Sequence, residues 1–186
     1  NKDIASAEQA AEMRRFVKKY NLKNYFEVGR GGVCHQVMVD EGFAAPGRLI
    51  VGADSHTCTN APGRLIVGAD SHTCTYGGLN AFSTGIGSTE AAACFAEGRL
   101  WFKVPESIKV KVNGKFKEYV SGKDLILKII SDIGVDGANY KAFEFCGDLQ
   151  NVSISDRLAV SNMAIEAGGK AGIFPCDKLT EDFLKG

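Results

Sequence analysis

The chain has 186 residues, of which 45% are hydrophobic and 24% are charged, a composition typical of an ordinary soluble globular protein. Its 22 basic and 22 acidic residues cancel, which argues against an electrostatic nucleic-acid binder, because such a protein should show a basic excess. No apolar run approaches the roughly 20 residues that span a bilayer. The six cysteines lack paired spacing and the first residues do not resemble a signal peptide, so we expect reduced thiols in a cytoplasmic or organelle-matrix setting.

The first half of the chain is expected to alternate between helices and strands. Helices are predicted at residues 7–20, at 33–40 as a helix or short turn, and at 89–102. Short apolar runs predict strands at residues 25–28, 49–52 and 65–68. The helix at 89–102 is expected to bury an apolar face made of Ala93, Ala96, Leu100 and Trp101.

The second half continues the alternation and adds a hairpin. Within residues 107–120, apolar residues alternate with lysines up to Asn113-Gly114, the dipeptide that most strongly indicates a β-hairpin. Helices are predicted at residues 124–133, 158–167 and 179–184, and a strand at 142–145. This order predicts an α/β fold, a three-layer α/β/α sheet with one β-hairpin. We expect residues 1–104 to form its first part and residues 105–186 its second.

A sixteen-residue segment occurs twice in a row, as APGRLIVGADSHTCTN at residues 45–60 and APGRLIVGADSHTCTY at residues 61–76. Two copies fall short of the three or more units that a solenoid needs, so we expect a duplication inside an ordinary globular domain. One copy is expected to occupy the native strand and site, while the other is extruded or adds a strand. An extruded strand would expose apolar surface and promote self-association.

Each copy follows its apolar strand with Asp-Ser-His-Thr, at the sheet edge where open α/β folds bind ligands. An aspartate orients and charges an imidazole, a serine hydroxyl bonds a carboxylate, and a histidine acts as general acid. The alternative is that Asp and Ser cap the following turn and His lies on the surface. His35 and Glu166 are further candidates, although a lone histidine near a loop is usually structural and a helical glutamate usually solvated.

Metal binding has weak support in the residue pattern. The pairs His56 and Cys58, and His72 and Cys74, could suit zinc, but structural zinc sites prefer Cys-x2–4-Cys pairs, which the sequence lacks. An iron–sulfur cluster usually needs three or four converging thiolates, whereas the cysteines here are scattered. The glycine runs could cradle an anion, but no Walker or Rossmann spacing accompanies them.

Three separated stretches, in the same order along the chain, together resemble the aconitase superfamily. They are FEVGRGGVCHQ (26–36), LIVGADSHTCTYGGLNAFSTGIGSTE (65–90) and NMAIEAGGKAGIFP (162–175). Within the superfamily they are most similar to the large subunits of 3-isopropylmalate dehydratases and homoaconitases. The resemblance implies dehydration and rehydration of a hydroxy-dicarboxylate or tricarboxylate substrate at a [4Fe–4S] cluster, one iron of which acts as a Lewis acid.

The resemblance also implies roles for individual residues. It gives catalytic roles to His35, Asp70, His72 and Glu166, with His35 paired to Asp70, and substrate contacts to Ser71 and Asn162. The first copy offers Asp54, Ser55 and His56 as alternatives. The second copy is preferred because it leads into Tyr76-Gly77-Gly78, the glycine loop that follows this motif in the family.

Three features of the family are missing from the sequence. The Gly-Ser-Cys-Thr-Asn and Cys-x-x-Cys motifs that carry the cluster cysteines are absent, so we expect no metal ligand in this chain and no cluster bound by it. The Asp-His motif is also absent, as are the serine base and substrate-binding arginines, which the family carries on a swivelling domain or small subunit. We expect a middle fragment of a longer enzyme, inactive alone, with no nucleic-acid or membrane partner. The alternative is a non-catalytic binding or structural domain that retains the fold.

Overall fold

The computed structural model describes residues 3–27, 29–30, 50–52 and 65–185. The chain divides into two compact units, Asn1–Val33 and Cys34–Gly186, which are described separately below. No helix in the described part of the chain is long and apolar enough to cross a membrane. The boundary near residue 104 that the sequence suggests stays a prediction.

The first unit is built on helix α1 (Ile4–Tyr20). Asp3 caps its start by accepting a hydrogen bond from the Ser6 backbone, and Asn21 ends it in the left-handed conformation, so the predicted helix is confirmed and begins earlier than expected. The strand predicted at residues 25–28 was wrong over its described part, 25–27, which has no regular structure. Glu27 instead forms a salt bridge of 2.6 Å with Arg14 of α1.

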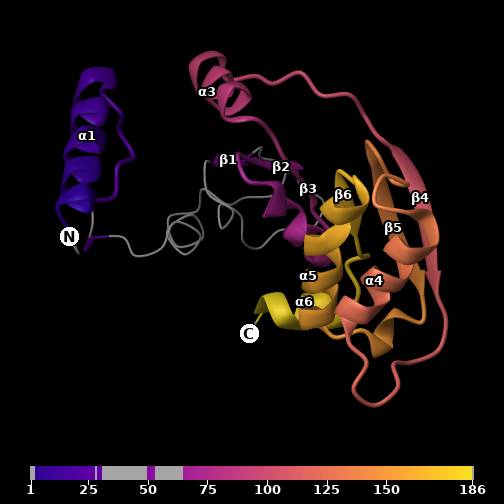
Figure 1. The fold of residues 1–186 in the computed structure, drawn as a ribbon. Coiled ribbons are helices and arrows are strands. Elements are labelled where there is room, and N and C mark those ends of the chain that lie inside the picture. The colour runs from indigo at the N-terminus through magenta and orange to yellow at the C-terminus, as the bar shows by residue number, and fades with distance from the viewer. Residues whose placement is uncertain (1–2, 28, 31–49, 53–64, 186) are drawn as a thin grey trace. The chain divides into compact units, whose positions relative to one another are not determined.

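The second unit contains a parallel sheet in the order β1-β2-β3, made of β1 (Ile50–Gly52), β2 (Leu65–Gly68) and β3 (Phe82–Gly85) (Figure 1). The two strands predicted in the duplicated segments are therefore confirmed, and the duplication adds a strand to the sheet. The register pairs Ile50 with Ile66 and Gly52 with Gly68, so each residue of β1 lies beside its own copy in β2. Strand β3 was not expected from the sequence.

Ser83 of β3 supplies a test of this packing. Its side chain is fully buried (0% exposed), and its Oγ has no hydrogen-bond partner among the described residues. A buried hydroxyl without a partner is costly, so Ser83→Ala is expected to raise the free energy of unfolding by about 1 kcal/mol. Ser161→Ala is the matched control with the opposite expectation, because the Ser161 hydroxyl is also buried but donates to the Gly172 carbonyl at 2.6 Å. Urea unfolding of both variants checks the prediction, and equal shifts in the two would contradict it.

Beyond β2 the chain forms the 3-10 helix η1 (Ser71–Leu79) and, after β3, helix α3 (Ser88–Glu97). Helix α3 was predicted to reach residue 102, but Gly98 ends it in the left-handed conformation. Its buried residues are Ala91 and Cys94. The expected apolar face was therefore wrong: Ala93 and Ala96 are exposed, Leu100 and Trp101 lie beyond the helix, and Trp101 is 82% exposed.

A second parallel sheet has the order β4-β5-β6, made of β4 (Glu106–Val112), β5 (Lys141–Gly147) and β6 (Ala171–Ile173). Between and after its strands lie α4 (Gly122–Ile133), η2 (Leu149–Asn151), α5 (Ile154–Asn162), η3 (Met163–Ala167) and α6 (Lys178–Lys185). The strand at 142–145 and the helices at 124–133, 158–167 and 179–184 are confirmed with shifted ends. The helix predicted at 158–167 consists of the α-helix α5, which continues as the 3-10 helix η3.

The β-hairpin predicted around Asn113-Gly114 was wrong. Strand β4 pairs with β5 in parallel, and residues 113–120 contain no strand. Gly114 does turn the chain, with φ of 89°. Its N–H donates to the Asp148 carboxylate and its carbonyl accepts from the Asn151 side chain. The turn is thus bound to the segment after β5, and no returning strand forms.

The main hydrophobic core lies between this second sheet and helices α4 and α5, which cover one of its faces (Figure 1). It is built around Ile126 of α4, Phe143 and Phe145 of β5, and Val160 of α5. Phe174, directly after β6, stacks on Phe145 with ring centroids 4.3 Å apart. Helices alternate with parallel strands through the unit, so the predicted α/β class is confirmed.

Candidate active site

The Asp-Ser-His-Thr motif of the second copy forms the turn between β2 and η1. Asp70 caps η1, because its Oδ1 accepts a hydrogen bond from the His72 backbone at 3.0 Å. The same oxygen lies 3.2 Å from Nδ1 of His72, so Nδ1–H points at the carboxylate and Nε2 is left for another partner. The His72 side chain is 50% exposed and the Asp70 side chain is 38% exposed, so a ligand can reach both.

Ser71 and Thr73 lie on opposite sides of this turn. The Ser71 hydroxyl is exposed, and its contacts within the described part of the chain are long, 3.4 Å to Asp70 Oδ1 and 3.4 Å to His72 Nδ1. Such distances are weak for hydroxyl hydrogen bonds, so a ligand oxygen could replace them at little cost. Thr73 is buried and donates to the Asp70 carbonyl at 2.7 Å, which fixes the backbone of the turn.

Two hydrogen bonds join η1 to the end of α5. The Cys74 thiol donates to the Asn162 carbonyl at 3.2 Å, a contact between residues 88 positions apart in the sequence. The Asn162 side chain donates through Nδ2 to the Thr75 hydroxyl at 2.8 Å. Two of the motifs singled out in the sequence, the Asp-Ser-His turn and the asparagine, therefore lie next to each other.

The chemical state of Cys74 follows from its surroundings. The pKa of its thiol is raised to about 12, mainly by burial and to a smaller extent by the negative charges of Asp70 and Glu166. The thiol is therefore protonated at neutral pH and serves as a hydrogen-bond donor.

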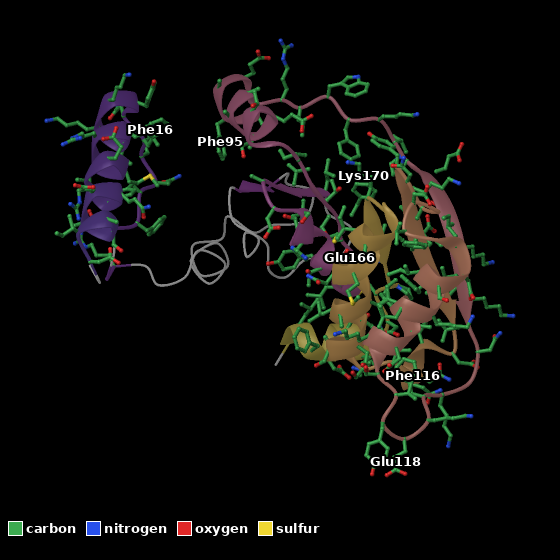
Figure 2. The ribbon with its side chains drawn as sticks, viewed as in Figure 1. Phe16, Phe95, Phe116, Glu118, Glu166 and Lys170 are labelled. Carbon is green, nitrogen blue, oxygen red and sulfur yellow. The ribbon has the colours of Figure 1, made fainter. Side chains whose placement is uncertain are left out.

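Glu166 lies on η3, the short helical segment that joins α5 to β6, and its side chain is exposed (Figure 2). It follows Asn162 by about one helical turn, so the two residues are held by one continuous helical segment. Its catalytic role stays a prediction, as do the roles of the other site residues. His35, Asp54, Ser55 and His56 lie outside the described residues, and with them the predicted pairing of His35 with Asp70.

Close packing behind η1 distinguishes the two copies. A Cβ added at Gly77 would lie 1.9 Å from the Gly172 carbonyl oxygen of β6, and one at Gly78 would lie 2.9 Å from the Arg157 backbone. Only glycine fits such approaches of one backbone to another. The corresponding positions after the first copy are Ala61 and Pro62. This packing favours the second copy as the one that continues into the site.

Sequence reasoning missed the parts that Cys74 and Thr75 play in holding Asn162. Both stand in the duplicated motif, but their roles depend on Asn162, far along the chain, and only the fold brings these residues together. The only signal in the sequence was their position directly after the Asp-Ser-His triplet.

The described cysteines do not form a cluster site. Iron–sulfur clusters are held by three or four converging thiolates, whereas the Cys74 thiol is buried and donates to the Asn162 carbonyl. Cys94, Cys146 and Cys176 are free thiols, and no three His, Cys, Asp or Glu side chains of the described part lie close enough together to hold a metal ion. Cys34 and Cys58 lie outside the described residues. The cysteine positions that the structure describes therefore do not fit a [4Fe–4S] cluster.

Comparison with known families assigns the chain to a class. The model of the aconitase family (aconitate hydratase) matches residues 1–61 and again residues 59–186, so the chain belongs to the aconitase family. The two matches meet at the junction of the two copies, as expected when one family motif is present twice.

Individual relatives are similar over the whole chain. The large subunit of 3-isopropylmalate dehydratase from Caldanaerobacter subterraneus subsp. tengcongensis is 51% identical over 185 residues, which are 100% of this chain and 40% of the relative. The same subunit from Moorella thermoacetica is 51% identical over 186 residues, again 100% of this chain and 40% of the relative. The subunit from Campylobacter hominis is 51% identical over 184 residues, 99% of this chain and 40% of the relative. The chain thus spans about 40% of the length of these curated relatives.

Proposed function

We propose that this chain contributes one wall of the active site of an aconitase-family hydro-lyase, which isomerises a branched hydroxy-acid such as isopropylmalate by dehydration and rehydration. The observation that carries the proposal is the junction of η1 with α5 through Cys74, Thr75 and Asn162. This junction puts an aspartate–histidine pair, a hydroxyl and an amide on adjoining segments. The identity of about half of all residues to dehydratase large subunits supports the choice of substrate class.

Each residue then has a definite task. Asp70 holds the imidazole of His72 through Nδ1, and Nε2 is directed to donate or accept a proton at the substrate. The exposed Ser71 hydroxyl binds a substrate carboxylate. Glu166 supplies a second carboxylate that accepts or returns a proton during loss of the hydroxyl group. This division of roles suits dehydration, which must remove a proton and a hydroxyl from neighbouring carbons.

The complete enzyme is proposed to hold a [4Fe–4S] cluster, which would supply Lewis-acid chemistry at the substrate hydroxyl. We propose that its cysteine ligands belong to the part of the relatives that this chain does not span, because the thiols described above do not fit. A small subunit is proposed as the partner that carries the serine base and the substrate-binding arginines. Alone, the chain is proposed to be inactive. The cytoplasm is the proposed compartment, since reducing conditions suit its free thiols.

The proposal is tested by titrating the ¹⁵N-labelled chain with 2-isopropylmalate and following its amide signals by NMR. We expect shifts in η1 and at the end of α5, with the affinity reduced by about 2- to 10-fold in His72→Gln, the loss expected for one hydrogen bond. Lys128→Gln is the control, because Lys128 is exposed on α4 and pairs with Asp132 of its own helix. Isobutyrate, which has one carboxylate and no hydroxyl, is the control ligand.

Three results would overturn the proposal. Binding that His72→Gln leaves unchanged would remove these residues from the site. A full cluster on the chain after anaerobic incubation with iron and sulfide would mean that its own cysteines are the ligands. No binding of 2-isopropylmalate at all would favour the alternative, a domain that retains the fold without this function.

A further inference from the structure

The hydroxyl of Thr75 takes part in two hydrogen bonds, and their partners determine which group is the donor in each. Its Oγ1 lies 2.6 Å from the His72 carbonyl, and a carbonyl oxygen only accepts, so the single hydroxyl hydrogen of Thr75 is donated there. Towards any other partner the hydroxyl can only accept. Its second partner, the Asn162 side chain at 2.8 Å, must therefore be the donor.

This constraint orients the Asn162 amide. The NH₂ group is the only donor of that side chain, so Nδ2 faces Thr75 and Oδ1 faces the opposite way. The Cys74 thiol holds the Asn162 carbonyl at 3.2 Å, so consecutive residues of η1 fix both the main chain and the side chain of the asparagine. None of the described residues donates a hydrogen bond to Oδ1.

We infer that Thr75 is a positioning residue of the site, which turns the Asn162 amide so that Oδ1 accepts a hydrogen bond from the hydroxyl group of the substrate. The inference rests on the function proposed above and adds a specificity to it. An amide oxygen accepts from a hydroxyl and repels a carboxylate, so Asn162 distinguishes the hydroxy-acid from its deoxy analogue. The substrate carboxylate is left to the Ser71 hydroxyl.

The first test concerns the orientation of the amide and needs no ligand. In the chain labelled with ¹⁵N-asparagine, Asn162→Asp identifies the Nδ2 signals by their loss. We expect Thr75→Val, which has nearly the same shape without a hydroxyl, to shift these signals and to speed their exchange with solvent severalfold. Thr75→Ser keeps the hydroxyl and should resemble the original chain. Unchanged Nδ2 signals in Thr75→Val would overturn the inference.

The second test concerns recognition and compares 2-isopropylmalate with isopropylsuccinate, which lacks the hydroxyl. The original chain and Thr75→Ser are expected to prefer the hydroxy-acid by about 2- to 10-fold, the range for one hydrogen bond. Thr75→Val is expected to lose this preference while still binding both ligands. Retention of the preference in Thr75→Val would overturn the inference.

The two tests separate this inference from the function on which it rests. If the original chain binds neither ligand, the proposed function fails for this chain and the hydroxyl specificity fails with it. The Nδ2 signals then still show whether Thr75 orients Asn162. The backbone amide signals of α4 and β5, remote from Thr75, report whether each variant keeps its fold.

Discussion

Gly77→Ala is expected to lower the free energy of unfolding by about 3 kcal/mol, at the upper end of the range for overpacking. The added methyl group would lie 1.9 Å from the Gly172 carbonyl oxygen, which is main chain and has no rotamer that could relieve the clash. Gly77 also accepts a hydrogen bond from the Phe174 N–H at 2.9 Å. A displacement of η1 would therefore weaken its attachment to the end of β6 as well.

Gly87→Ala is the matched control, because there the new methyl group would meet only the flexible Glu90 side chain at 3.3 Å. Gly87 caps α3, where alanine in place of glycine costs less than about 1 kcal/mol. Urea unfolding followed by circular dichroism measures both variants. If Gly77→Ala is as stable as Gly87→Ala, the close approach of η1 to β6 is wrong. Gly77→Ala would also place after the second copy the residue that follows the first copy, Ala61.

Arg157→Met is expected to destabilise the chain by about 3 kcal/mol, the lower end of the range for breaking a buried ion pair, because the Asp177 side chain left behind is 33% exposed. Arg157 is 0% exposed and forms a two-bonded pair with Asp177, at 2.9 and 2.6 Å. It also donates to the Leu149 and Val152 carbonyls and to the Thr180 hydroxyl. One guanidinium thus joins α5 to the segments on both sides of it, and methionine would remove all of these hydrogen bonds.

The pH dependence identifies the ion pair within this network. Hydrogen bonding to Arg157 is the main cause that holds the pKa of the Asp177 carboxyl below its usual range. A group whose pKa is lower in the folded state stabilises the fold above its unfolded pKa, so this contribution is lost as the pH falls below about 4. We expect the double variant Arg157→Met with Asp177→Asn to lack that loss and to be more stable than Arg157→Met alone. Unfolding midpoints measured from neutral to acidic pH decide this, and a double variant as acid-sensitive as the original chain would contradict it.

The sequence predicted elements well where local pattern and final environment agree. The LIVG runs read as buried strands, and both lie in a sheet. The Asn-Gly signal was correct for a turn at Gly114 but wrong for a hairpin, because β4 pairs with a strand that begins only at Lys141. Strand β3 was missed because Phe82 is followed by Ser83, Thr84 and Gly85, which have no strand-like apolar pattern, although Ser83 and Thr84 are buried in the fold.

The same limit applies to the candidate site. Its motif residues could be singled out because they stand together as Asp70-Ser71-His72, and Asn162 because it stands in a recognisable stretch. Thr75 could not, since its partner is 87 positions away in the sequence. Gly77 was seen as part of a loop, but the reason that it must be glycine is the backbone of β6, which no local pattern reveals.

The pairing of β1 with β2 has a consequence for how the sheet could grow. Each residue of β1 pairs with its own copy in β2, as Ile50 pairs with Ile66, so the two neighbouring strands have the same sequence in the same register. Identical segments stacked in parallel and in register are the relation on which cross-β fibrils are built. A third copy of the segment would meet at β1 the same sequence of backbone donors and acceptors that β1 meets at β2. Among the described residues β1 is the edge strand of this sheet, so the duplication has placed at that edge a strand that matches its neighbour residue by residue.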